Sequence, residues 1–161
     1  GNVWFVQNVK IVPDADTEIL ALDSLNTRQT AIVQKKFANE ITSKIFPVDS
    51  TDSIELVAHQ PNYLKYKSNS AKEKLAVFSE VYYPEGWNVY VDGNEANYFK
   101  VDYILRAMMV PKGTHIIEFK FEPEVVKTGS NISLASNIVL ILIVLGGLFY
   151  GYRKKASTAE A

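Results

Sequence analysis

A stretch of nineteen residues, Leu134 to Tyr152, contains no charged side chain. As a helix it would be roughly 28 Å long at 1.5 Å per residue, close to the ~30 Å hydrocarbon core of a bilayer. The alternative is a buried core helix, but in a domain of this size such helices are shorter and amphipathic. The stretch therefore predicts one transmembrane helix, which we place at residues 131–153.

Basic residues follow the predicted span directly, as Arg153-Lys154-Lys155. Clustered basic residues beside a span stay on the cytoplasmic side, and tyrosines such as Tyr150 and Tyr152 are enriched at the membrane interface. Residues 154–161 are thus expected to be a short cytoplasmic tail. Residues 1–130 are then a domain on the outer face of the membrane.

The span also carries a possible contact with other helices. Gly147 and Gly151 form a small-xxx-small pair, which permits close packing against a second membrane helix. The ordinary glycine content of a membrane helix explains the pair equally well. The expected surroundings of the span are the lipid bilayer and the remaining transmembrane helices of a larger parent protein.

Composition excludes several classes of function. The 161 residues carry a net charge of −1, and the part before Arg153 holds 14 basic and 17 acidic residues, so no basic face for nucleic acid is expected. The absence of cysteine excludes disulfides, thiolate metal sites and a cysteine nucleophile. With two histidines and no glycine-rich phosphate loop or zinc motif, we expect no metal, no cofactor and no catalytic residue.

The part before the span reads as mainly β. In the last segment Ile117, Phe119 and Phe121 alternate with charged residues, which indicates a strand with one buried face. Asp92-Gly93 predicts a type I′ hairpin turn. Short strands with frequent turns predict an antiparallel β-sandwich followed by a single C-terminal transmembrane helix. The expected strands are Trp4–Val12, Thr30–Phe37, Ser53–His59, Asn62–Lys67, Leu75–Tyr82, Trp87–Val91, Glu95–Lys100, Tyr103–Val110 and a last one ending at Pro123.

One short helix is expected after Pro13. Asp14 is suited to cap its first turn, and the helix should end near Asn26. Ala15, Ile19 and Leu22 recur at helical spacing and predict its buried stripe.

The richest set of candidate binding residues combines aromatic rings with charged groups. Rings stack on sugar faces and carboxylates accept hydroxyl protons, so the set suits glycan binding. The alternative is that the rings fill the sandwich core and that Pro84-Glu85-Gly86 is only a turn. For Arg106, within an apolar strand, an ion pair with Glu80 or Asp92 and simple exposure to solvent are both consistent. The candidate glycan-binding residues are Glu80, Tyr82, Tyr83, Trp87, Asp92 and Arg106.

An ordered series of short motifs resembles the end of the YfhO family of bacterial membrane proteins. The motifs are Phe78–Trp87, Val91–Gly93, Tyr103–Ala107 and Val110–His115, with the opening Gly1–Val6 and the helical Glu18–Leu22. The resemblance implies a multi-spanning glycosyltransferase of the bacterial cytoplasmic membrane, of the polyprenyl-phosphate-sugar type, that modifies cell-envelope polymers. In that class the catalytic carboxylate lies in an early outer loop, which has no counterpart here. The start at Gly1 fits a piece of such a longer chain.

Three functions remain for this part of the protein. The first is a non-catalytic outer domain that covers the active face of a membrane glycosyltransferase or helps hold its acceptor, with an envelope glycan or a polyprenyl-phosphate sugar as partner. The second is an independent carbohydrate-binding module. The third is a purely structural domain that packs on its own membrane helices, which an exposed apolar face would favour.

Overall fold

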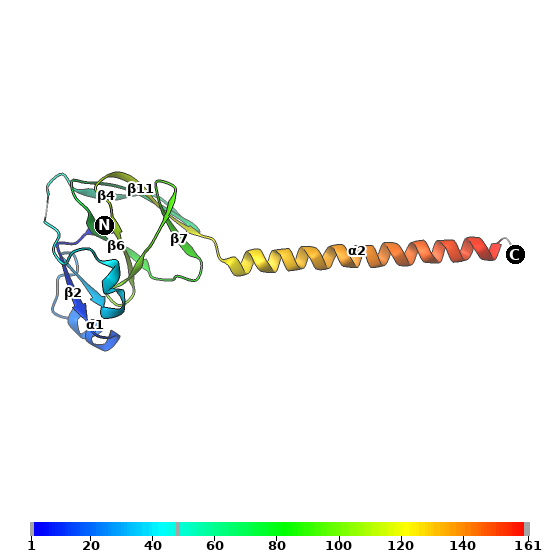
Figure 1. The fold of residues 1–161 in the computed structure, drawn as a ribbon, viewed down its shortest axis with the longest axis horizontal. Helices are drawn as coiled ribbons and strands as arrows, with labels where there is room; N and C mark the ends of the chain where they lie inside the picture. The colour runs from blue at the N-terminus through cyan, green and yellow to red at the C-terminus, as the bar shows by residue number, and fades with distance from the viewer. Residues whose placement is uncertain (1, 48, 160–161) are drawn as a thin grey trace. The chain divides into compact units, whose positions relative to one another are not determined.

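The computed structural model describes residues 2–47 and 49–159, with the backbone alone for residues 124, 127, 131 and 148–159. The chain forms two compact units, Gly1–Glu122 and Pro123–Ala161. The elements, shown in Figure 1, are β1 (Val3–Phe5), β2 (Asn8–Val12), α1 (Ala15–Leu22), β3 (Thr30–Gln34), the 3-10 helix η1 (Lys35–Glu40), β4 (Ser53–Gln60), β5 (Tyr63–Ser70), β6 (Lys74–Val81), β7 (Trp87–Val91), β8 (Asn94–Ala96), β9 (Phe99–Val101), β10 (Leu105–Val110), β11 (Gly113–Phe121) and α2 (Glu124–Ala159).

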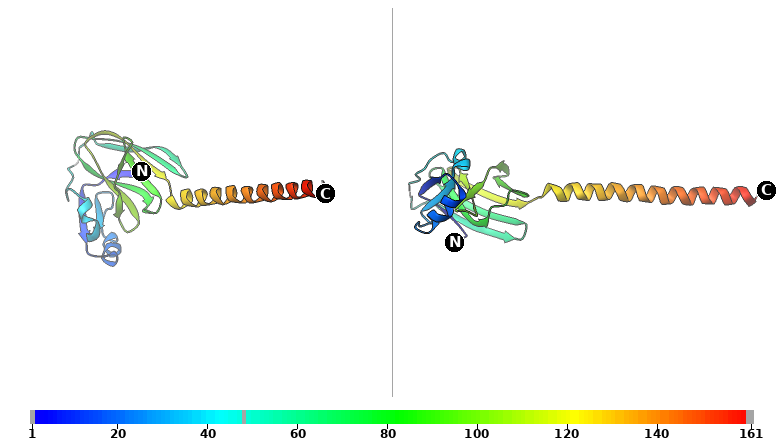
Figure 2. Two further views of the ribbon diagram at one scale, coloured as in Figure 1. Left: turned by 45° about the vertical axis from the view of Figure 1, so that its right-hand side comes forward. Right: turned by 90° about the horizontal axis from the view of Figure 1, so that it is seen from below.

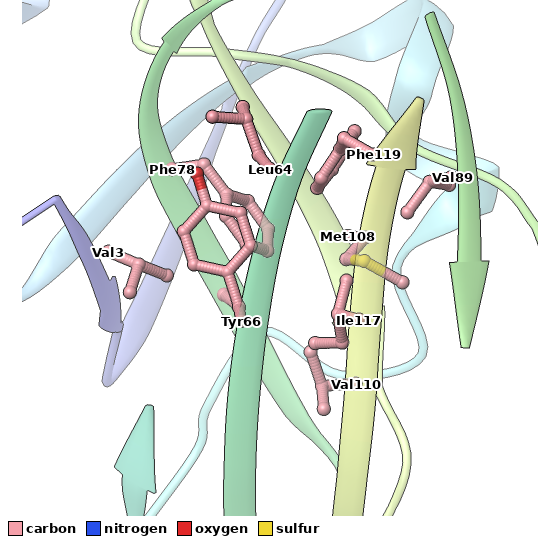
Figure 3. Close-up of a cluster of buried hydrophobic side chains, with 10 residues drawn as sticks. Val3, Leu64, Tyr66, Phe78, Val89, Met108, Val110, Ile117 and Phe119 are labelled. Atoms are coloured by element: carbon pink, nitrogen blue, oxygen red, sulfur yellow. The ribbon is translucent and has the colours of Figure 1, made fainter. Parts of the chain in front are cut away.

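Two antiparallel sheets make up most of the first unit. One has the strand order β1-β6-β10-β9 and the other the order β4-β5-β11-β7-β8. Side chains from both sheets meet between them and point toward one another, among them Tyr66, Phe78 and Phe119 (Figure 3). Their rings pack edge to face, with centroids 4.8 Å apart for Tyr66–Phe78 and 5.1 Å for Phe78–Phe119. The expected antiparallel sandwich is thus confirmed.

The four-stranded sheet is buried on both faces. Along β6, Ala76 and Phe78 point into the sandwich core, whereas Leu75 and Val77 belong to a second core on the opposite face. All four side chains are fully buried. This two-sided burial explains why β6 reads as a continuous apolar run, a pattern more typical of covered parallel sheets than of antiparallel ones.

The second core is covered by a small parallel sheet. β2 and β3 pair in parallel, with Asn8 opposite Thr30, and α1 connects them. The helix α1 packs on the outer face of this pair through a buried cluster of Val12, Ala21 and Ile32. In Figures 1 and 2 this β2-α1-β3 unit, in blue and cyan, lies to one side of the green sandwich strands.

The predicted strand over Trp4–Val12 is wrong as a single element. β1 pairs with β6, whereas β2 pairs with β3 in a different sheet. The chain changes partner at Val6 and Gln7: the Val6 amide donates to Leu75 O, and the Gln7 amide donates to Gln29 O. Apolar content was therefore a good guide to strand formation here and a poor guide to strand pairing.

The start of α1 follows the prediction but its buried face does not. Asp14 Oδ1 accepts a hydrogen bond from the Thr17 amide at 2.8 Å, as expected for an N-cap. That bond lowers the pKa of Asp14. Of the expected stripe of Ala15, Ile19 and Leu22, Leu22 packs against the buried cluster, but Ile19 is 48% exposed and Glu18 is fully buried.

Other boundaries differ in detail. The strand that begins at Thr30 ends at Gln34 and continues as η1, and the expected return strand Glu95–Lys100 is divided between β8 and β9. The turn at Asp92-Gly93 has φ values of 51° and 83°, as the predicted type I′ hairpin requires.

Two buried carboxylates fix the β2-α1-β3 unit to the four-stranded sheet. Glu18 accepts from Gln34 Nε2 at 2.5 Å and from the Tyr103 amide at 2.9 Å. Asp102 Oδ1 accepts from the Ile32 amide at 2.8 Å, and the Asp102 amide donates to Ile32 O at 2.9 Å. Burial raises the pKa of Asp102 to about 6, and the nearby charge of Glu18 adds to this, although the Ile32 hydrogen bond acts in the opposite direction.

The second unit contains α2. Within it Thr128–Gly147 is the one segment, among the described residues, long and apolar enough to cross a membrane. The helix begins at Glu124, before residue 131 where we place the start of the span, because helix formation continues beyond the apolar segment. The basic residues Arg153-Lys154-Lys155 lie outside the residues whose side chains are described.

The raised pKa of Asp102 predicts a pH-dependent stability. A carboxyl whose pKa is raised by folding stabilises the folded state when it is protonated. This contribution is fully present below the unfolded pKa of 3.8 and is lost as pH rises through about 6. The loss amounts to at most about 3 kcal/mol at 1.36 kcal/mol per pKa unit. Asp102→Asn should remove this pH dependence, because the side-chain amide keeps an oxygen that accepts from the Ile32 amide and cannot ionise.

Chemical unfolding of the full chain in detergent micelles, from about pH 4 to about pH 7.5, measures this difference. The stability of the variant relative to the natural chain should rise with pH. An identical pH dependence for the two would show that Asp102 ionises normally.

Candidate functional site

The aromatic-rich segment lies at the end of the sandwich where β11 finishes, which we call the exit end. Phe121 pairs with Trp87 there, and the Glu122 amide donates to Gly86 O at 2.6 Å. The hydroxyl oxygen of Tyr98 lies 2.9 Å from Tyr83 O and 3.0 Å from Trp87 O, so its single proton is shared between these two acceptors. These bonds fix the connection between β6 and β7 at this end.

Arg106 enters the sandwich core at the exit end. It lies on the same face of β10 as Met108, next to a shift in the β6–β10 register between Leu105 and Arg106. Its guanidinium carbon is 4.8 Å from the ring centroid of Trp87 and 4.9 Å from that of Phe119, both within cation–π distance. The residue is only 3% exposed, so the exposed alternative does not hold.

The guanidinium is incompletely hydrogen-bonded. Its Nη2 donates to Val81 O at 3.1 Å, but Nε and Nη1 are buried with no hydrogen-bond partner among the described residues. The Tyr66 hydroxyl, in the same core, is also buried without a partner. Burial lowers the pKa of Arg106 and raises the pKa of Tyr66. Buried polar groups are usually paired, so these donors mark a place where a polar partner would be favourable.

Glu80 acts on Arg106 through its charge rather than through a hydrogen bond. It is partly exposed on β6, and its carboxylate opposes the burial effect on the pKa of Arg106. Among the described residues, no ion pair joins Arg106 to either carboxylate that the sequence suggested. The charge of the arginine is therefore only partly balanced.

Asp92 lies elsewhere, at the opposite end of β7. Its Oδ2 is 2.6 Å from His115 Nδ1, its Oδ1 accepts from the Ile116 amide, and His115 Nε2 is 2.9 Å from Lys112 O. These contacts lower the pKa of Asp92 and raise the pKa of His115. Since both ring nitrogens face acceptors, the imidazolium form satisfies both. The pair connects two turns and leaves Asp92 outside the exit-end cluster.

Four of the six predicted residues meet at the exit end: Glu80, Tyr82, Trp87 and Arg106. Tyr83 is beside them with 49% of its surface exposed, and no other aromatic ring among the described residues packs against its ring. Tyr98 was missed, yet its ring packs 5.4 Å from Tyr82 and 5.5 Å from Phe119. The available signal was an aromatic residue within the predicted strand Glu95–Lys100. Whether these residues bind a glycan stays a prediction.

A cavity of about 360 Å³ lies elsewhere, beside the edge strand β1. Its lining shares no residue with the exit-end cluster. The charged pair beside it, Lys74 and Asp52, is joined at 2.6 Å and almost fully buried, so the charges largely cancel. Unpaired donors and stacked rings instead gather at the exit end, which we take as the candidate site. The described residues hold no cluster of metal-ligating groups.

The unpaired donors of Arg106 predict an unusual stability result. Arg106→Met keeps an unbranched stem in the core and removes two unsatisfied donors, at the loss of one hydrogen bond to Val81 O. Replacing buried charge by apolar groups is often neutral or stabilising by ~1–4 kcal/mol. The free energy of unfolding of the full chain in micelles should therefore stay the same or rise.

Arg28→Met is the matched control, because Arg28 is exposed and lies over the Trp4 ring at 4.9 Å. A loss of more than about 3 kcal/mol for Arg106→Met alone would instead mean that the arginine is needed to hold the fold.

Comparison with known families gives one result that covers most of the chain. The sequence model of the family described as bacterial membrane protein YfhO matches residues 20–133. Comparisons with curated proteins and with solved structures give no match. The match includes β3 to β11 and the start of the apolar part of α2, and thus all the candidate site residues. The chain therefore belongs to the YfhO family of bacterial membrane proteins.

Proposed function

We propose that residues 1–130 form the non-catalytic, extracytoplasmic domain of a membrane glycosyltransferase that acts on cell-envelope glycopolymers. In this proposal the domain helps hold the acceptor glycan near the active face, and the chemistry belongs to other parts of the parent protein. The observation that carries it is the buried guanidinium of Arg106, which lies beside the partly exposed residue Trp87. Two of its donor nitrogens have no partner among the described residues.

The chemistry of the cluster suits a sugar. Trp87 and Tyr82 are partly exposed aromatic residues, and Glu80 offers a carboxylate that can accept hydrogen bonds from hydroxyls. Arg106 can donate to ring or hydroxyl oxygens once a small rearrangement opens its Nε and Nη1. Binding sites of this kind combine apolar surface with a few placed polar groups.

The orientation is proposed from sequence. The basic cluster Arg153-Lys154-Lys155 follows the candidate span Thr128–Gly147 within one to two turns of helix. Under the positive-inside rule this places the C-terminus in the cytoplasm and the β domain on the outer face of the cytoplasmic membrane. The bilayer and the remaining helices of the parent are the expected surroundings, and a polyprenyl-phosphate sugar is the expected donor of the parent.

The independent carbohydrate-binding module uses the same cluster and shares the binding test below. The purely structural domain predicts no glycan binding. Exposed apolar side chains on the first unit, such as Leu20 at 76%, are the observation that favours it.

The two tryptophans allow a clean binding test. Trp87 lies in the candidate site, and Trp4 lies on β1 beside the separate cavity. Trp4→Phe leaves Trp87 as the reporter, and Trp87→Phe leaves Trp4. Titration of each full chain in micelles with isolated envelope glycopolymer should change the emission of the Trp4→Phe chain only, because the sugar contacts Trp87.

Dextran, a neutral polysaccharide, tests for nonspecific effects. An unchanged Trp87 signal at saturating glycopolymer would contradict a glycan site at the exit end. An equal response of both reporters would show that the polymer binds without preference for this cluster.

A further inference from the structure

We infer that the exit end of the sandwich contacts the lipid bilayer directly, through an apolar surface that is exposed on the first unit. We call it the exit-end patch and define it as Val81, Tyr83, Tyr103 and Ile104. The partner is the interfacial layer of the bilayer, where headgroups meet acyl chains. This goes beyond the proposed function and does not depend on which side of the membrane the domain occupies.

The patch is unusually apolar for a solvent-facing surface. Val81 is 61% exposed, Ile104 50%, Tyr83 49% and Tyr103 38%. Exposed apolar side chains are normal when scattered, but contiguous ones mark an interaction surface. Among the described residues of the first unit, half of the large hydrophobic side chains that are exposed belong to this patch.

Hydrogen bonds and strand pairing connect the patch to the point where the chain leaves the domain. Val81 pairs with Leu105 across β6 and β10, and the Tyr82 amide donates to Ile104 O at 2.7 Å. The segment then reaches Gly86, whose carbonyl accepts from the Glu122 amide. Glu122 is the last residue of the first unit. The patch and the chain exit therefore belong to the same end of the sandwich.

Covalent geometry keeps this end near the membrane at any angle between the two units. Phe121 ends β11, α2 begins at Glu124, and the candidate span begins at Thr128. Three residues at most about 3.6 Å each and four helical residues at about 1.5 Å each give an upper limit of roughly 17 Å. Interfacial segments bury their apolar face about 5–10 Å into the headgroup boundary, which this tether permits.

The rim of the patch has the character of an interfacial surface. Lys100 Nζ lies 5.1 Å from the Tyr103 ring, and Lys36 Nζ lies 5.0 Å from the Phe37 ring, which packs at 6.1 Å on Tyr82. Lysines that extend over aromatic rings can reach phosphate headgroups while the rings stay in the interface. Exposed Glu85 in the same connection opposes this attraction, so the apolar side chains should contribute most of the contact.

Site-directed labelling tests the contact, and the chain contains no cysteine, so each introduced thiol is unique. Ile104→Cys and Val81→Cys probe the patch. Ile45→Cys and Val57→Cys are matched controls, with exposures of 68% and 53%. Ile45 lies at the opposite end of the sandwich, because neighbouring Phe46 bonds to Gln7 O and Val6 bonds to Leu75 near the start of β6.

Each full-length variant carries an environment-sensitive fluorophore in nanodiscs of phosphatidylcholine, with or without phosphatidylglycerol. Lipids with a nitroxide near the headgroup should quench the probes at 81 and 104 and leave those at 45 and 57 bright. Iodide in the aqueous phase should give the reverse order.

Equal quenching by lipid at all four positions would contradict a specific contact. Protection of 81 and 104 from both quenchers would overturn the lipid assignment and show that protein covers the patch. Circular dichroism of each labelled chain confirms that it remains folded.

Discussion

The two-sided burial of β6 is the constraint on which the rest of the structure depends. Its alternate side chains hold two cores at once: Phe78 packs against Tyr66 and Phe119 on one face, and Val77 packs with the β2-β3 layer on the other. Burial of apolar area contributes ~25 cal/mol per Å² to the stability of the fold. Because β6 buries both of its faces, a substitution that disturbs this strand affects both layers. The strand also ends at Val81, whose carbonyl receives the Arg106 hydrogen bond.

Arg106 and the Glu18–Asp102 pair show how polar groups are used in this frame. The carboxylates of Glu18 and Asp102 accept hydrogen bonds from backbone amides, and these bonds connect the β2-α1-β3 unit to the four-stranded sheet. Arg106 makes one hydrogen bond to a backbone carbonyl, and two of its nitrogens have no partner among the described residues. The first arrangement contributes to architecture, although Asp102 Oδ2 is also buried without a hydrogen-bond partner among the described residues. The second leaves most of a charged donor group unused by the fold. This difference is why the candidate site is placed at the exit end, near the patch inferred to meet lipid.

Local chemistry in the sequence predicted local structure well. Asp14 capped its helix, Asp92-Gly93 formed its turn, and alternation in Ile117–Phe121 identified β11. These features depend on residues within a few positions of one another. The antiparallel sandwich followed from them, because short alternating strands with tight turns have few other ways to bury one face.

Features set by long-range partners were not predicted. The break at Gln7 depends on Gln29, and the burial of Glu18 depends on Gln34 and Tyr103, which lies 85 residues away. For the site, residue type identified Trp87 and Arg106, but only the fold shows that Asp92 pairs with His115 at the far end of β7. Hydrophobic periodicity carries no information on which other strand a given strand will pair with.

The central proposal is that the exit-end cluster helps hold the acceptor of a parent glycosyltransferase and is not needed to hold the fold. Sugar transfer to envelope glycopolymer by the complete parent protein carrying Arg106→Met tests it most directly, with Arg28→Met as the matched surface control. The account predicts reduced transfer for Arg106→Met at a normal membrane level of the protein, with transfer by Arg28→Met unchanged. Full transfer by the Arg106→Met protein would contradict it.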